Sequence, residues 1–399
     1  MIDTIAWLIC LLTALPLLVL ALECIVGARP PKLPAGSPAP PPFVVVMPAH
    51  QEAAGIAAAL RSVITQLRPC DAVLVVADNC TDDTAAIARK LGARVVERID
   101  PSRMSKGYAL EFAKEELQSD PTLAKIETIL VIDADCWAGP GALQRLAAKS
   151  AESGAAVQGA YLLECPENAP VVVRVSCFAF LIKNLVRQLA LHRLAGTALL
   201  QGSGMAFPRD VFLEAEWPTQ SLVEDLEFGL DLLLSGTPVI FEPLAKFYSS
   251  ASSLGGTTGQ RRRWEHGMLQ TAAVCVPRLL GGAFRTPGGR ARKLAERWPL
   301  LAVALDMLVP PTVLLGLLLV AAMLSVWAMT GASTPFFVLL SAGLILTFAV
   351  VNAWWMQGRA ILRPADLIGS GRYLLWKLPI LFQFVTRRER KWIRTERGP

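Results

Sequence analysis

Short apolar runs alternate with segments of helical periodicity between residues 43 and 153. The runs FVVVMP, AVLVVAD, ARVVER and ETILVIDAD have the length and aliphatic content of buried strands. The segments between them repeat apolar residues every three or four positions, as at Ile56, Leu60 and Val63, and predict helices. Because strands that alternate with helices favour βαβ units, we expect an α/β fold with a mostly parallel, Rossmann-like sheet.

Three longer apolar stretches have a different character. Ile5–Leu22, Met307–Met329 and Pro335–Gln357 carry no charged residue over roughly the 20 residues that a membrane span requires. A secretory signal peptide is the alternative for the first stretch, but the N-terminus carries Asp3 and no basic residue, which favours an uncleaved helix. The predicted transmembrane helices are 1–27, 299–330 and 335–357.

Basic residues flank these stretches on one side. They precede the second stretch and crowd the C-terminus, whereas the connector 330–334 contains no Lys or Arg. The positive-inside rule therefore predicts that residues 29–298 and the C-terminal tail are cytoplasmic. The composition agrees with a membrane protein, since 53% of residues are hydrophobic and only 18% are charged, with a net charge of +6.

The rest of the chain divides by composition. Residues 28–42 form a proline-rich linker, and residues 43–280 are expected to form one cytoplasmic domain. Within it, 171–194 is apolar but interrupted by charges, which predicts an interfacial amphipathic helix, with a buried core helix as the alternative. Residues 372–399 are expected to form an interfacial helix followed by a basic cytoplasmic tail.

Several classes of protein are disfavoured. The eight cysteines are scattered without a CxxC pair and only three histidines are present, which argues against a disulfide scaffold or a Cys/His zinc site. No GxGxxG turn follows the first predicted strand, so a dinucleotide fold is disfavoured. The arginine runs lack interleaved aromatic residues, which argues against nucleic-acid binding.

Acidic residues stand where predicted strands end. Glu52 and Asp78 follow the first two strands, and Asp133 and Asp135 end the fourth. Ligands of open parallel sheets bind at these carboxyl ends. A pair of carboxylates two residues apart can hold Mg²⁺ or Mn²⁺ and leave positions for phosphate oxygens, although a solvated turn would also explain the pair.

Other candidate residues lie around this predicted edge. Lys106 opens a helix and offers an ammonium group to phosphate. The small residues Gly202, Ser203 and Gly204 form a turn that a sugar could approach closely.

Two further motifs follow along the chain. Glu224 and Asp225 open a helical segment, where an acid could act as general base or simply cap the helix. In GGTTGQRRRW, the run Gly255–Gly259 predicts a mobile loop before the three arginines.

The order of the motifs PAHQE, ADNCTDDT, DADC, GSGMAF, VED and QRRRW, with flanking membrane helices, resembles membrane-bound family 2 glycosyltransferases of GT-A fold. That group includes cellulose, hyaluronan and poly-N-acetylglucosamine synthases and ceramide glucosyltransferase-like enzymes. The resemblance covers residues 43–275.

The resemblance implies roles for the acidic residues. Asp78 resembles the acid that contacts uridine, and Asp133 and Asp135 resemble the metal-binding DxD motif. Asp225 matches the catalytic base of the TED motif, with Glu224 beside it, although Val223 stands where the family usually has Thr.

The resemblance also extends to the remaining motifs. Gln260 and Arg263 match the diphosphate-contacting residues of QxxRW, and Trp264 matches its acceptor-site residue. Glu52 and Lys106 fit donor positions, and Gly202–Gly204 fits the acceptor side. The roles of Arg261 and Arg262 stay open.

The resemblance implies a metal-dependent inverting hexosyltransferase at a bacterial inner (plasma) membrane. Its expected partners are a nucleotide-sugar, most simply a UDP-sugar, a membrane lipid or lipid-linked saccharide acceptor, and the bilayer. The pathway would be glycolipid or exopolysaccharide biosynthesis. A processive polysaccharide synthase and a catalytically silent nucleotide-sugar-binding subunit are the alternatives, and assembly as a homo-oligomer or in a biosynthetic complex stays open.

Overall fold

The computed structural model describes residues 1–32, 39–219, 221, 223–251, 254–285, 289 and 291–366, and only the backbone of 254–266. The chain divides into two units. The sheet unit includes Pro31–Pro166 and Gly196–Gly256, and the helical unit includes Met1–Pro30, Glu167–Ala195 and Thr257–Arg390.

The sheet unit is organised around a mixed sheet in the order β3-β2-β1-β4-β7-β6-β8-β5. The strands that the described residues form are β1 (Phe43–Ala49), β2 (Ala72–Asp78), β3 (Arg94–Arg98), β4 (Thr128–Val131), β5 (Cys136–Ala138), β6 (Val157–Glu164), β7 (Met205–Pro208) and β8 (Ile240–Ser250).

The first half of this sheet is parallel, as the sequence predicts. β1 pairs in parallel with both β2 and β4, and β2 pairs in parallel with β3. The chain thus runs outward from β1 to β3 and then returns to the other side of β1, which creates a switch point between β1 and β4. The second half is mixed, because β7 is antiparallel to β4 and β6, and β5 is antiparallel to β8.

Helices of the sheet unit connect these strands. They are α2 (Ile56–Ile64), α3 (Thr84–Lys90), α4 (Lys106–Ser119), α5 (Ala142–Ser153), α8 (Arg209–Glu214) and α9 (Glu224–Ser235). Helix α4 packs on β1 and β2, and its N-cap Ser105 accepts a hydrogen bond from the backbone N–H of Tyr108. The carboxyl ends of β1, β2 and β4 therefore lie beside the first turn of α4.

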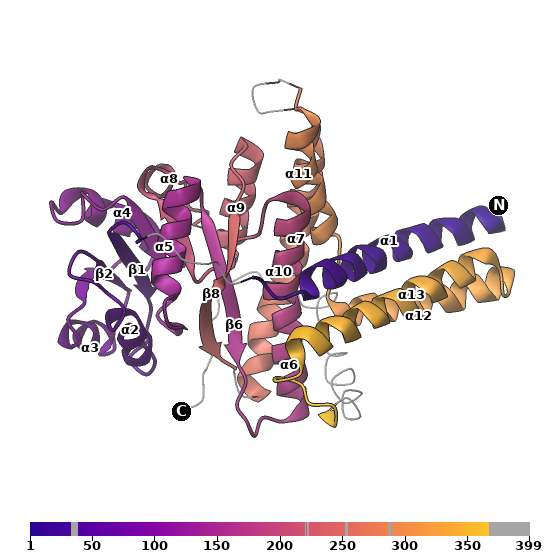
Figure 1. Cartoon of the computed structure of the whole chain (residues 1–399), viewed down its shortest axis with the longest axis horizontal. Coiled ribbons are helices and arrows are strands. Elements are labelled where there is room, and N and C mark those ends of the chain that lie inside the picture. Colours follow the sequence, from indigo (N-terminus) through magenta and orange to yellow (C-terminus); the bar gives the residue numbers. More distant parts are fainter. Residues whose placement is uncertain are drawn as a thin grey trace. The chain divides into compact units, whose positions relative to one another are not determined.

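The helical unit contains the apolar stretches. Its elements are α1 (Ile2–Ala28), α6 (Val171–Leu181), the π-helix η1 (Ile182–Val186), α7 (Arg187–Ala195), most of α10 (Leu254–Phe284), α11 (Leu294–Met307), α12 (Thr312–Thr330), α13 (Thr334–Ala353) and the π-helix η2 (Trp354–Gly358). Among the residues that the structure describes, three helices are long and apolar enough to cross a membrane: Ile2–Ala28, Thr312–Thr330 and Thr334–Gly358. Figure 1 shows α1, α12 and α13 side by side, in agreement with their contacts.

The predicted helix 299–330 is two helices. Helix α11 ends at Met307, and α12 begins at Thr312 after Pro310 and Pro311. Pro311 has no backbone N–H to donate and its ring excludes the preceding turn, so the two prolines separate the helices rather than kink one. The candidate span therefore starts later than the apolar stretch does.

The interfacial interpretation of 171–194 is not what the structure shows. Residues 171–195 form one nearly continuous helix through α6, η1 and α7, and most of its side chains are buried, including Arg174 and Arg187. An interfacial helix would instead expose one apolar face. The burial agrees with the buried-helix alternative, and α7 contacts α1 and α11 of the same unit.

Other boundaries also differ from the sequence prediction. The predicted domain 43–280 is divided, since the chain from Thr257 groups with the helical unit. The predicted loop Gly255–Gly259 has helical backbone in the first turns of α10. Residues 33–38 of the predicted linker and the whole of 372–399 lie outside the described residues.

One buried charge cluster ties the helical unit together. Arg187 Nε lies 2.8 Å from Glu23 Oε2 of α1, and Arg187 Nη2 lies 2.8 Å from Asp306 Oδ1 of α11. All three residues are at most 7% exposed. The guanidinium supplies donors to both carboxylates, so α1, α7 and α11 are joined by charge-assisted hydrogen bonds.

Replacing this cation should destabilise the helical unit. Arg187→Met leaves two buried carboxylates without a partner, which is expected to cost about 3–5 kcal/mol. Thermal unfolding in detergent should therefore show a clearly lower Tm than for Lys183→Met, which removes an exposed cation from the same helical segment. Equal Tm values for the two variants would refute a structural role for the cluster.

Candidate active site

Three of the predicted donor residues lie at or just after the carboxyl ends of parallel strands. Glu52 follows β1, Asp78 ends β2, and Asp133 follows β4. Two residues near these strand ends, Gln51 and Asn79, adopt positive φ angles of 56° and 51°, respectively. Left-handed backbone at non-glycine residues is costly and clusters at functional sites, so both positions mark this edge as one shaped for a ligand.

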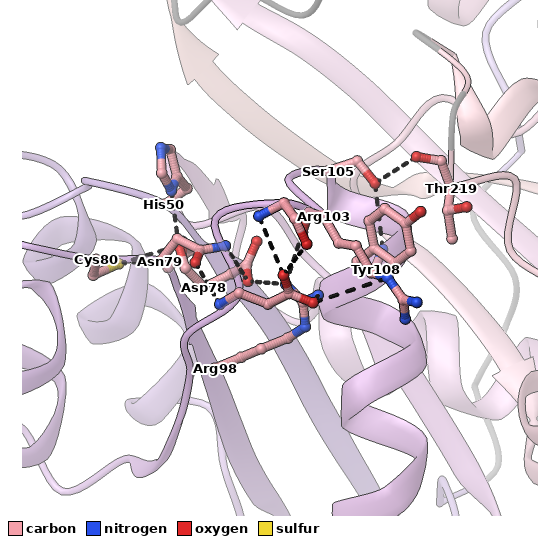
Figure 2. A network of polar contacts seen from close by, with 12 residues as sticks. His50, Asp78, Asn79, Cys80, Arg98, Arg103, Ser105, Tyr108 and Thr219 are labelled. Carbon is pink, nitrogen blue, oxygen red and sulfur yellow. Dashed lines mark hydrogen bonds and ion pairs between the residues drawn. The ribbon is translucent and has the colours of Figure 1, made fainter.

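Asp78 is the centre of a polar network at the end of β2 (Figure 2). Its carboxylate Oδ1 lies 2.6 Å from Arg98 Nη1, and it also accepts a hydrogen bond from Asn79 Nδ2. The Asp78 carbonyl accepts from His50 Nδ1 at 2.7 Å. Only 5% of Asp78 is exposed, and the ion pair compensates for the burial of its charge.

Arg98 is a site residue that the sequence analysis missed. It ends β3, so it stands at the same sheet edge as Asp78. Its guanidinium carbon lies 5.4 Å from the centroid of the Tyr108 ring, and Nη1 also donates to the carbonyl of Arg103. The position of an arginine at the carboxyl end of the third predicted strand was the available signal.

The DxD pair forms a candidate metal site. Ligand atoms of Asp133, Asp135 and Cys136 all lie within 4.8 Å of one another. The Cys136 thiol is a soft sulfur donor, which suits Mg²⁺ and Mn²⁺ poorly. The two carboxylates remain, and oxygen donors of this kind fit Mg²⁺ or Mn²⁺.

Lys106 links Asp133 of the candidate metal site to the glycine-rich turn at Gly202. Its Nζ lies 2.6 Å from Asp133 Oδ1 and also donates to the carbonyl of Gly202. Burial lowers the pKa of Lys106, but the carboxylates of Asp133, Asp225 and Glu224 outweigh burial and raise it above its usual value. The ammonium is therefore a permanent positive charge among acidic groups.

The acid pair Glu224 and Asp225 begins α9 and faces this ammonium. Burial, and then the charge of Asp225, raises the pKa of Glu224 to about 7. Burial also raises the pKa of Asp225, although Lys106 opposes the shift. A raised pKa makes a carboxylate a stronger base, which favours the acceptance of a proton from a hydroxyl.

The glycine-rich turn supports both groups of acids. Ser203 is fully buried, and its Oγ accepts a hydrogen bond from the backbone N–H of Asp133 at 3.1 Å. Gly202 has φ +92°, and a Cβ there would lie 3.0 Å from Asp225 Oδ2. Gly204 has φ +68°, and a Cβ there would overlap the ring of Phe247. This turn thus requires glycine on both sides of Ser203.

The structure brings together many, but not all, of the predicted residues. Lys106, Asp133, Asp225 and Gly202 are linked by the contacts above, and Asp135 adjoins them. Asp78 forms a separate cluster with Arg98 at the end of β2. Glu52 is half-buried after β1, and its backbone N–H donates to Thr84 Oγ1. The side chains of Gln260, Arg263 and Trp264 lie outside the described residues.

Comparison with known proteins agrees with this fold. A family model described as "Glycosyltransferase like family 2" matches residues 40–267. The mannosyltransferase PcManGT from Pyrobaculum calidifontis, solved with GDP-Man and Mn²⁺, superposes with a TM-score of 0.60 at 19% identity, over 98% of this chain and 100% of that one. This similarity confirms the GT-A fold.

Two other solved structures are less similar. S. aureus TarS 1-349 with UDP-GlcNAc matches at TM-score 0.45 and 14% identity, over 88% of this chain and 93% of that one. Glucosyl-3-phosphoglycerate synthase from Mycobacterium tuberculosis matches at TM-score 0.39 and 20% identity, over 62% of this chain and 84% of that one. No curated protein sequence gave a significant match.

Metal binding should depend on the carboxylates and not on the thiol. Asp135→Asn is expected to weaken Mn²⁺ binding at least about 10-fold, because it removes an anionic oxygen ligand. Cys136→Ser should change the affinity less than about 3-fold, since Mn²⁺ prefers oxygen to sulfur ligands. Titration of Mn²⁺ followed by electron paramagnetic resonance measures both, and a larger loss in the Cys136 variant would contradict the assignment.

Proposed function

The chain belongs to the glycosyltransferase-like family 2, and from this premise we propose that it transfers a hexose from a nucleotide-sugar to a membrane lipid or lipid-linked saccharide. One observation carries the proposal. The ammonium of Lys106 contacts Asp133 of the DxD pair and faces the Glu224–Asp225 pair. The DxD carboxylate suited to a metal-bound diphosphate and the acid pair suited to a hydroxyl proton therefore both lie next to the Lys106 ammonium.

The proposed reaction is a single displacement with inversion. Asp225 accepts the proton of an acceptor hydroxyl, and the hydroxyl oxygen forms a bond to the anomeric carbon of the donor. The bond between that carbon and the diphosphate oxygen breaks, and the nucleoside diphosphate leaves with the electron pair. Burial, and then the charge of Asp133, raises the pKa of Asp225 against the opposing charge of Lys106, which makes Asp225 a stronger base than an isolated aspartate.

Charge on the departing diphosphate requires compensation. Mg²⁺ or Mn²⁺ bound by Asp133 and Asp135 would supply a Lewis acid for the diphosphate oxygens. Lys106, at the N-terminus of α4, provides an ammonium group and helix N–H groups on the same side. Gln260 and Arg263 are proposed as further diphosphate contacts and Trp264 as an acceptor contact, on the resemblance of QRRRW alone.

The Asp78–Arg98 pair supports a choice among nucleobases. A carboxylate accepts a hydrogen bond from a ring N–H, and a guanidinium donates to an adjacent carbonyl. Uracil, thymine and guanine present an N–H beside a carbonyl, whereas adenine has no carbonyl and cytosine has no ring N–H there. A UDP-sugar is the simplest donor, and GDP-mannose, the sugar nucleotide bound by PcManGT, is the second.

The helical unit supports a membrane acceptor. Three helices could span a bilayer, and α1 exposes a run of large apolar side chains on its outer face, among them Leu8, Leu11 and Leu15. We place the chain with the membrane-bound synthase-like and ceramide glucosyltransferase-like enzymes, at the cytoplasmic face of a bacterial inner membrane. A processive synthase would give a ladder of products from purified protein, and single transfer would give one added sugar.

A donor panel tests the function directly. Purified protein in lipid nanodiscs with Mn²⁺ and a membrane lipid extract should release nucleoside diphosphate from a UDP- or GDP-sugar and none from ADP-glucose. Nucleotide binding without turnover for any donor would instead favour the catalytically silent subunit. Turnover of ADP-glucose alone would contradict the proposal that the Asp78–Arg98 pair binds a nucleobase with an N–H beside a carbonyl.

A matched pair of variants tests the proposed base with the donor that the panel identifies. Asp225→Asn should lower kcat about 100-fold or more, since it removes a general base. Glu227→Gln lies on the same first turn of α9 and should keep kcat near the wild-type value. Nucleotide affinity should be preserved in both, and a wild-type kcat for Asp225→Asn would exclude it as the base.

A further inference from the structure

One face of α4 lies along the chain segment that precedes the acid pair. Gly107, Glu111 and Lys114 are spaced four and three residues apart, so they share this face of the helix. The segment Ala215–Thr219 runs past them in the opposite direction, as the contacts below describe.

The contacts occur at three levels of the helix. Near its N-terminus, Ser105 Oγ donates to the carbonyl of Thr219 at 2.8 Å, as Figure 2 shows. A Cβ on Gly107 would lie 3.1 Å from Thr219 Cα, so only glycine lets the two backbones approach this closely without displacing one of them.

At the second and third levels, two paired side chains, Glu111 and Lys114, each form a hydrogen bond with the backbone of the segment. Glu111 Oε1 accepts a hydrogen bond from the Trp217 N–H at 2.9 Å, and Lys114 Nζ donates to the carbonyl of Ala215. Glu111 and Lys114 also pair with each other at 2.9 Å. Both charges are thus compensated while each fixes one peptide group of the segment.

The Trp217 side chain carries this restraint to α9. Its ring centroid lies 4.5 Å from that of Phe228, and it also packs against Phe207 and Phe212. Phe228 is three residues after Asp225 on the same helix, so it is fixed one turn from the proposed base. Trp217 is 3% exposed, and its Nε1 has no hydrogen-bond partner among the described residues. Its burial therefore serves ring packing.

The N-terminal turn of α4 is also tied to the donor side of the site. Lys106 contacts Asp133, and the Tyr108 ring lies under Arg98, the partner of Asp78. Helix α4 therefore contacts Asp133 of the candidate metal site, Arg98 of the proposed nucleobase site, and the segment before the acid pair. A rigid helix with these three attachments fixes the distance between the departing diphosphate and the proposed general base, Asp225.

We propose that Glu111 and Lys114 are positioning residues that clamp the segment Ala215–Trp217 and thereby set the place of Asp225 relative to the bound donor. The proposal rests on the proposed function, because it assigns the clamp to the same transfer reaction. Neither residue contacts the substrate in this account. Their effect passes through Trp217 and Phe228 to α9.

The test separates positioning from donor binding. Glu111→Ala should lower kcat about 10–100-fold, since a displacement of about 1 Å at a base can cost that much. The donor KM and the affinity for the nucleoside diphosphate should change less than about 3-fold. Glu111→Gln keeps an acceptor oxygen for the Trp217 N–H and should recover most of kcat.

Controls keep every outcome informative. Glu115→Ala removes an exposed acid from the same helix and should behave as wild type. Lys114→Gln provides a second variant if Glu111→Ala does not fold, with the same expected split between kcat and nucleotide affinity. Binding stoichiometry by calorimetry gives the folded fraction in each sample.

Two results would overturn the clamp. In one, Glu111→Ala keeps the wild-type kcat. In the other, kcat and nucleotide-binding stoichiometry fall in proportion, which would indicate only a loss of folded protein. Absence of transfer by the wild-type protein with every donor would refute the proposed function instead, so the two failures are distinguishable.

Discussion

Three carboxylates lie around the ammonium group of Lys106 at one edge of the sheet. Asp133, Glu224 and Asp225 would repel one another if they were gathered without compensation, and Lys106 offsets their charge. The surrounding structure holds this arrangement in place. Helix α4 fixes the position of Lys106, and Ser203 in the glycine-rich turn holds the backbone of Asp133.

This charge balance also supports the proposal that the site binds a nucleotide-sugar. Excess negative charge draws in a divalent cation, and the cation in turn suits a diphosphate. Burial, and then the neighbouring carboxylates, raises the pKa values of Glu224 and Asp225, which favours proton transfer from a hydroxyl. The helical unit shows the same principle in a structural role, where Arg187 offsets two buried carboxylates and joins three helices.

Local patterns predicted the parts of the fold that depend on neighbouring residues. The parallel half of the sheet and the acids at its strand ends were predictable, because aliphatic runs and strand ends are local features. The role of Arg98 and the α4 contacts were not predicted, since Glu111 and Trp217 are 106 residues apart in the chain. The helix 171–195 was misinterpreted for the same reason, because Glu23 is 164 residues from Arg187. The sequence of the helix itself does not reveal the buried carboxylates that pair with Arg187.

The most direct test of this account is the metal dependence of nucleotide binding. Calorimetric titration of UDP and of GDP into the purified protein should be done with Mn²⁺ and again with excess chelator. We predict at least about 10-fold tighter binding of one of them with Mn²⁺, because the cation joins the diphosphate to Asp133 and Asp135. Equal affinity under both conditions, or no binding of either nucleotide, would contradict the assignment of this acidic edge as a donor site.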